Sequence, residues 1–153
     1  MPDAPPLPEQ KKCTLRGHAE PVTCIAVDAN FLFSGSEDRT ILVWNLSAIA
    51  SDFDELSQDT IHPPAAVIQA HSGTVTDVMI VASVGYLISC GSDARGRVWD
   101  YTVTYEDEEE KEQEHGPERV GRLLRDVSCA DETPRCLAFM EGGTFLKADA
   151  VTR

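Results

Sequence analysis

The feature that most constrains this chain is an internal repeat of chemically matched residues. Two segments carry a histidine, a serine, an aspartate and a tryptophan in the same order. In both copies the serine precedes the aspartate by four residues, and the aspartate precedes the tryptophan by six. Self-similarity of this kind is typical of folds that array one small structural unit. The matched positions are His18, Ser34, Asp38 and Trp44 in the first copy and His71, Ser89, Asp93 and Trp99 in the second.

The apolar residues of each copy predict short β-strands. Val22–Val27 and Thr40–Trp44 alternate in polarity and are rich in β-branched and aromatic residues. Turn-forming residues separate the second and third strands, as in Ser36–Arg39. No part of the two copies has a sustained helical period, so the sequence predicts an all-β fold. Ala66–Gln69 and Val120–Leu124 are the expected outer strands of the two copies, and Asp52–Leu56 is the expected site of one helical turn.

At these residues the chain resembles the WD-repeat (WD40) β-propeller family, as a fragment or truncated member. Gly17-His18 matches the opening pair of the family's repeat, and Ala70-His71 departs from it by one residue. Trp99-Asp100 matches the closing pair, and Trp44-Asn45 is a variant of it. The resemblance implies an incomplete propeller over residues 13–153, with two clear four-stranded blades (about 15–69 and 70–126) and a partial third (about 127–153).

The family also implies that the four repeated side chains form a hydrogen-bonded chain. The indole of tryptophan only donates and a carboxylate only accepts, so serine and histidine, which do both, can link them. A Ser, His and Asp set can also be catalytic, but a nucleophile must lie beside a substrate cleft. Because this set occurs twice at repeat spacing, we expect architecture. We expect no catalytic, cofactor-binding or metal-binding residues.

The third repeat is incomplete. Arg135–Phe139 aligns with Thr23–Val27, but Ala130 occupies the opening histidine position and no closing tryptophan follows. Propellers typically close with about 4–8 blades. Two alternatives remain open: a longer parent chain supplies the missing blades, or the chain gains its packing from a partner or from self-association. In the family, a strand at Thr14-Leu15 would close the ring by pairing with the last blade.

The composition limits the classes of partner and the location that we expect for the chain. The net charge of −13 opposes binding to phosphate backbones, so we expect no direct contact with nucleic acid. The longest apolar stretches are far shorter than the roughly 20 residues that a membrane helix needs. Residues 1–12 are expected to be a disordered, proline-rich leader without a signal peptide. Five cysteines without a C-x-x-C pair are expected to be free thiols, and the expected location is the cytoplasm or nucleus.

Partner-binding candidates lie in the turns and in an acidic insert. The insert, residues 103–118, is most simply a solvated loop, and its functional alternative is a contact for a basic partner. His62 and His115 lie in inserts and are expected to face solvent. The candidate contact residues are Glu20, Glu37, Arg39, Thr74 and Arg95 in the turns and Glu108, Glu109 and Glu110 in the acidic insert.

The sequence thus predicts a non-enzymatic scaffold or adaptor that binds protein or peptide partners, some of them basic. One alternative is a substrate-recruiting or regulatory part of an enzyme complex, such as a ubiquitin ligase. Another is a non-functional truncated product. Fold alone does not decide among them.

Overall fold

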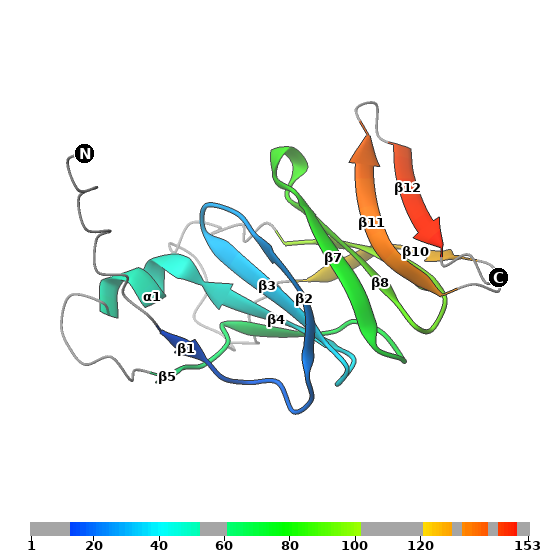
Figure 1. Ribbon diagram of the computed structural model, residues 1–153. Helices are drawn as coiled ribbons and strands as arrows, with labels where there is room; N and C mark the ends of the chain where they lie inside the picture. Colours follow the sequence, from blue (N-terminus) through cyan, green and yellow to red (C-terminus); the bar gives the residue numbers. More distant parts are fainter. Residues whose placement is uncertain (1–12, 53–60, 102–120, 130–132, 141–143, 150–153) are drawn as a thin grey trace, which may run out of the picture.

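The computed structural model describes residues 13–52, 61–101, 121–129, 133–140 and 144–149 (Figure 1). Within these ranges almost all of the regular structure is β-strand, with one short α-helix and one 3₁₀ turn. The elements are β1 (Thr14–Leu15), β2 (Val22–Val27), β3 (Phe31–Ser36), β4 (Thr40–Asn45), α1 (Leu46–Asp52), β5 (Ile61–His62), β6 (Ala66–Gln69), β7 (Val75–Val81), η1 (Ala82–Val84), β8 (Tyr86–Gly91), β9 (Arg95–Asp100), β10 (Arg122–Ser128), β11 (Pro134–Met140) and β12 (Thr144–Asp149).

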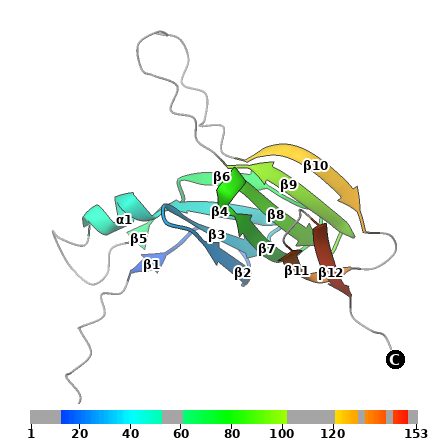
Figure 2. The same ribbon diagram turned by 90° about the horizontal axis from the view of Figure 1, so that it is seen from above.

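Two antiparallel four-stranded sheets form the body of the molecule. Their strand orders are β2-β3-β4-β6 and β7-β8-β9-β10, and a third unit consists of the β11-β12 hairpin. The inner strands β2, β7 and β11 lie side by side, and β6 and β10 lie at the outer edges (Figures 1 and 2). The prediction of an all-β fold with two four-stranded blades and a partial third is confirmed.

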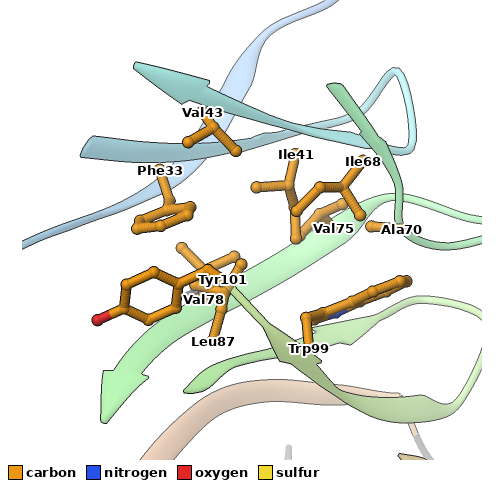
Figure 3. Close-up of a cluster of buried hydrophobic side chains, with 10 residues drawn as sticks. All are labelled: Phe33, Ile41, Val43, Ile68, Ala70, Val75, Val78, Leu87, Trp99 and Tyr101. Atoms are coloured by element: carbon orange, nitrogen blue, oxygen red, sulfur yellow. The ribbon is translucent and has the colours of Figure 1, made fainter. Parts of the chain in front are cut away.

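The main core lies between the two blades. Phe33, Ile41 and Val43 of the first blade are fully buried against residues of β7, β8 and β9 (Figure 3). Burial of such apolar side chains stabilises the fold by about 1.5–3 kcal/mol each. The ring of Tyr101 packs edge-on to Phe33, with 5.1 Å between the ring centroids. The remaining members of this cluster are Ile68, Ala70, Val75, Val78, Leu87, Trp99 and Tyr101.

One hydrogen bond repeats between successive blades. The hydroxyl of Thr23 on β2 donates to the backbone oxygen of Val75 on β7, at 2.5 Å. The hydroxyl of Thr76, one repeat later, donates to the backbone oxygen of Pro134 on β11, at 2.6 Å. Thr23 and Thr76 occupy matched repeat positions, so the same contact fixes each inner strand to the next one.

The face of the first blade that is turned away from the second has its own small cluster. Trp44 is 2% exposed there and packs with Leu42 and with Ile49 of α1. Leu15 and Leu46 pack against the same cluster. Outside this cluster, the first blade has exposed apolar side chains, including Ile25 (62%), Val27 (55%) and Val67 (52%).

One sequence expectation about the first insert is wrong, and another stays a prediction. Helix α1 covers Leu46–Asp52, and it begins at Leu46 because the side-chain oxygen of Asn45 caps it by accepting the amide hydrogens of Ser47 and Ala48. Residues 53–56 of the expected turn lie outside the described residues. His62 is 7% exposed and does not face solvent, because β5 pairs in parallel with β1 and its alternation leaves Ile61 outside. Thr14 and Leu15 therefore pair with β5 in this structure, not with a last blade.

The outer strand of the second blade begins later than expected and is longer. It covers Arg122–Ser128, where the sequence predicted Val120–Leu124. Gly121 turns the chain with a φ of 93°, and the strand then pairs along all of β9, with a bulge between Leu123 and Arg125. None of the helices in the described part of the chain is long and apolar enough to cross a membrane.

Candidate functional site

Each blade holds a relay of four side chains with nearly identical geometry. In the first blade, His18 Nδ1 lies 2.8 Å from Asp38 and His18 Nε2 lies 2.8 Å from the hydroxyl of Ser34. The indole of Trp44 donates to the same hydroxyl at 2.9 Å. In the second blade the corresponding distances are 2.9, 2.8 and 2.9 Å, among His71, Asp93, Ser89 and Trp99. In each blade the structure thus brings together the four residues of the predicted network.

The electrostatics of the second relay favour a neutral histidine beside a charged aspartate. Burial lowers the pKa of His71, and hydrogen bonding to Asp93 only partly offsets this effect. Burial raises the pKa of Asp93, but hydrogen bonds from Ser72 and His71 outweigh it, so the net shift is downward. A neutral ring can donate from Nδ1 to Asp93 and accept from Ser89 at Nε2. The pKa of Asp38 is lowered in the same way, by bonds from Thr40, His18 and Ala19 that outweigh burial.

The relay serines are not placed for nucleophilic chemistry. Ser89 is fully buried and Ser34 is 5% exposed. Each hydroxyl is engaged by both a histidine and a tryptophan, so no substrate carbonyl can approach it. Among the described residues, no three His, Cys, Asp or Glu side chains are grouped so as to hold a metal ion. Each relay links the segment before the inner strand, the second and third strands of the blade and the turn between them by hydrogen bonds.

The relays also fix a surface that we call the turn face, formed by residues 16–21, 36–40, 69–74 and 91–95. Equivalent backbone bonds connect its turns, from Glu37 N to Pro21 O (3.1 Å) and from Ser92 N to Thr74 O (2.8 Å). The residue after each relay aspartate has a positive φ, 74° at Arg39 and 58° at Ala94. Arg39 is therefore the structural counterpart of Ala94, and Arg95 begins the next strand.

The predicted contact residues of the turn face are placed as follows. Glu20, Glu37 and Arg39 are exposed, and no described carboxylate forms an ion pair with Arg39. Thr74 is partly buried. Arg95 is exposed but its guanidinium is paired with Asp126 at 2.8 Å, which reduces its freedom to meet a partner. Glu108, Glu109, Glu110 and His115 lie outside the described residues.

Sequence reasoning missed Arg97, the second arginine of this region. Its guanidinium lies 3.4 Å from Asp93 and 3.2 Å from Asp126, and it donates to the backbone oxygen of Ala70. The matched residue in the first blade is Leu42, whose side chain would lie 2.7 Å from a Cβ added at Gly17. A Cβ at position 17 would therefore crowd Leu42, whereas the second repeat, with Arg97 in the matched position, opens with Ala70.

At the opposite end of the blades, sequence reasoning named only the acidic insert and missed the described residues that we call the insert face: residues 28–31, 45–47, 82–85 and 101. There the hydroxyl of Tyr101 donates to Asp28 at 2.8 Å and joins the two blades across 73 residues of sequence. The side chain of Asp28 also accepts the amide hydrogens of Asn30 and Phe31. An Asp two residues before an Asn is a local turn signal, but the contact with Tyr101 has no local signature.

Comparisons with known proteins agree with this geometry. The family model described as "WD domain, G-beta repeat" matches residues 9–45 and 63–100. The small ribosomal subunit protein RACK1 of Caenorhabditis elegans is 34% identical over 98 residues, which cover 60% of this chain and 29% of that protein. The target of rapamycin complex subunit wat1 of Schizosaccharomyces pombe is 32% identical over 91 residues (57% and 24%), and mitochondrial division protein 1 of the same yeast is 28% identical over 95 residues (57% and 14%).

The chain thus spans less than a third of the length of each of these relatives. The two matched stretches contain all eight relay residues and all four turns of the turn face. The chain carries two WD40 repeats, each folded as a four-stranded blade.

Proposed function

We propose that the chain is a non-enzymatic scaffold or adaptor that binds a protein or peptide across its turn face. The observation that carries this proposal is the repeated relay, which fixes the turns of two adjacent blades in one orientation. A rigid display of side chains favours binding because little conformational freedom is lost on association. WD-repeat proteins generally act as interaction scaffolds, and two relatives are named as parts of larger assemblies, a ribosomal subunit and a target of rapamycin complex.

The composition of the turn face supports a polar partner segment. Glu20, Glu37 and Arg39 are all exposed, and the backbone of Arg39 has a positive φ of 74°. Arginine is enriched at the residues that dominate binding energy in protein interfaces. Arg39 is therefore the residue of this surface whose loss should weaken binding most.

We further propose that the protein acts in the cytoplasm or nucleus. Cys13, Cys24, Cys90 and Cys129 are free thiols in the structure, as is usual in a reducing compartment. Burial raises the pKa of Cys90 to about 11, which keeps this thiol protonated and slow to oxidise.

Affinity capture with matched variants tests the proposal. The immobilised chain would be exposed to nuclease-treated lysate, and recovered proteins would be quantified by mass spectrometry. The test variant exchanges two exposed charges, Glu37→Lys with Arg39→Glu, so the net charge is unchanged. Arg125→Ala, on the exposed outer strand, is the control. We expect at least one protein to be lost with the exchange and retained with the control.

The proposal is wrong if the wild-type chain recovers no protein above the empty matrix. It is also wrong if every recovered protein binds the exchanged variant and the wild type equally, because the turn face would then contribute nothing. Circular dichroism of each variant establishes beforehand that the blades remain folded.

A further inference from the structure

A cleft of about 680 Å³ opens on the insert face, where the two blades meet. The turn between β2 and β3 forms one wall, and the 3₁₀ turn η1 with Gly85 forms the other. Asn45 and Ser47, at the start of α1, and Tyr101, at the end of β9, complete the lining. The cleft therefore lies at the end of the blades opposite to the turn face.

The floor of the cleft is aromatic. Phe31 and Tyr101 meet edge to face, with ring centroids 6.4 Å apart and an interplanar angle of 76°. Tyr101 is only 6% exposed and rests against Phe33, so its position is fixed by the core between the blades (Figure 3). Aromatic rings attract cations through the negative potential of their faces.

A fixed carboxylate lies beside these rings. One oxygen of Asp28 accepts the backbone amides of Asn30 (2.8 Å) and Phe31 (2.7 Å), and the other accepts the hydroxyl of Tyr101 (2.8 Å). Burial raises the pKa of Asp28, but these hydrogen bonds outweigh it and the net shift is downward, so the group stays ionised. The oxygen that faces Tyr101 accepts a single bond from the described residues and keeps a free lone pair for a further donor.

In the part of the chain that the structure describes, the lining of the cleft includes one carboxylate and no Lys, Arg or His. In the sequence, two acidic segments follow elements that contribute to this lining: residues 53–60 follow α1 and carry a net charge of −3, and residues 102–120 follow Tyr101 and carry a net charge of −6. Together they hold most of the chain's net charge of −13. Such a concentration of negative charge attracts cationic ligands and raises their association rate.

We propose that this cleft receives one lysine or arginine side chain from a basic peptide segment of a partner protein. The cation would lie against the Phe31 and Tyr101 rings and donate to Asp28, while Ser83 and Asn45 border the peptide backbone. This inference rests on the proposed function as an interaction scaffold. It adds a second binding surface, on the insert face, and names a basic side chain as the group that binds there.

Fluorescence anisotropy with a defined probe tests the inference. The probe is a fluorescein-labelled peptide, Gly-Lys-Gly-Arg repeated three times, titrated with the full chain at low salt. Its matched control carries acetyl-lysine and citrulline in place of lysine and arginine. We expect the probe to bind and the neutral control to bind at least about tenfold more weakly, because the charge-assisted hydrogen bond and the cation–π contact are both lost.

Variants separate the cleft from general attraction to acidic sequence. Asp28→Asn removes the charge of the carboxylate, and Ser83→Lys places a competing cation at the exposed rim. Each should weaken binding about five- to tenfold. The Glu37→Lys and Arg39→Glu exchange at the turn face should leave binding of this probe unchanged. The proposal for the cleft and the proposal for the turn face can therefore be refuted independently of each other.

Two results would overturn the inference. One is equal binding of the charged and neutral peptides. The other is unchanged binding by both cleft variants, with a loss only when Glu108, Glu109 and Glu110 are replaced by glutamine. If Asp28→Asn unfolds the chain, Ser83→Lys decides alone, because Ser83 is exposed and its substitution leaves the core intact. Amide chemical shifts provide a second measurement: the probe should perturb Asn30, Ser83 and Gly85 and not Ala19 or Glu37.

Discussion

Replacing Ser89 with alanine removes one oxygen atom and disconnects the relay of the second blade. The hydroxyl is fully buried and lies 2.8 Å from His71 Nε2 and 2.9 Å from the Trp99 indole nitrogen. Alanine fits the same space, so the cost comes from the two polar groups that are left unpaired. Each such group costs about 1–3 kcal/mol, which predicts a loss of about 2–6 kcal/mol in the free energy of unfolding for the two groups together. That is a large part of the roughly 5–15 kcal/mol typical of a whole domain.

The first blade provides the matched comparison. In Ser34→Ala, His18 Nε2 and the indole of Trp44 lose their shared partner, as His71 and Trp99 do in Ser89→Ala. The backbone oxygen of Ser34 lies 3.0 Å from His18 Nε2, but both atoms are acceptors when the ring donates from Nδ1 to Asp38, so this oxygen cannot replace the hydroxyl. We therefore expect Ser34→Ala and Ser89→Ala to destabilise the protein by similar amounts.

Urea denaturation followed by far-ultraviolet circular dichroism measures these free energies. A double-mutant cycle with Trp99→Phe, which keeps an aromatic ring but removes the indole N–H, isolates the hydrogen bond. The two substitutions should be non-additive by more than about 0.5 kcal/mol, the limit usually seen for independent sites. Additive effects, or a cost below about 1 kcal/mol for Ser89→Ala, would refute the argument that the relay holds the blade together.

Three further predictions follow from the same geometry. Trp99→Ala should cost about 3–5 kcal/mol and Trp44→Ala should cost less than Trp99→Ala, because Trp99 lies in the large core between the blades and Trp44 in the smaller cluster beneath α1; urea midpoints rank them. Ala94→Gly should stabilise the protein by about 1 kcal/mol because Ala94 has a φ of 58°, whereas Gly121→Ala should destabilise it at a φ of 93°; a shift of both melting temperatures in the same direction would contradict this. The pKa of His71 is lowered in the folded state, so its contribution is complete above the ordinary value of about 6.5 and is lost as the pH falls below it; stability should decline between pH 7 and pH 5 in the wild type, with a shallower slope in His71→Gln.

The blades could be predicted from the sequence because their determinants are periodic and repeated. The spacing of Ser34, Asp38 and Trp44 recurs in the second copy, and the identity of each residue as donor or acceptor limits how the four can connect. Strand pairing within each blade is between neighbours in sequence, so alternation and turn residues were sufficient to place it. The partial third unit was recognisable from one aligned strand.

What could not be predicted depends on contacts between distant segments. The burial of His62 results from the pairing of β5 with β1, whose paired residues lie 47 positions earlier in the sequence. A two-residue strand is too short to show an alternation of polar and apolar residues. The ion pair between Arg97 and Asp126 joins residues that are far apart in sequence, so the sequence around Arg97 did not indicate it. The cleft depends on Tyr101 reaching Asp28 in the other blade. The position of α1, by contrast, had a local signal in Asn45, a strong helix-capping residue.

Differences in length between the two repeats occur only at the insert face. The connection from the inner strand to the next is two residues longer in the second blade, where η1 and Gly85 take up the excess, and both long acidic segments start at this end. The paired turns at the other end have conserved their spacing within this one molecule. A domain acquired during evolution, or an epitope tag added in the laboratory between Asp52 and Ile61, would lengthen a connection without moving any hydrogen-bonded partner of the relay. Insertions at the insert face can therefore vary while the relays keep the turns of the turn face in the same orientation.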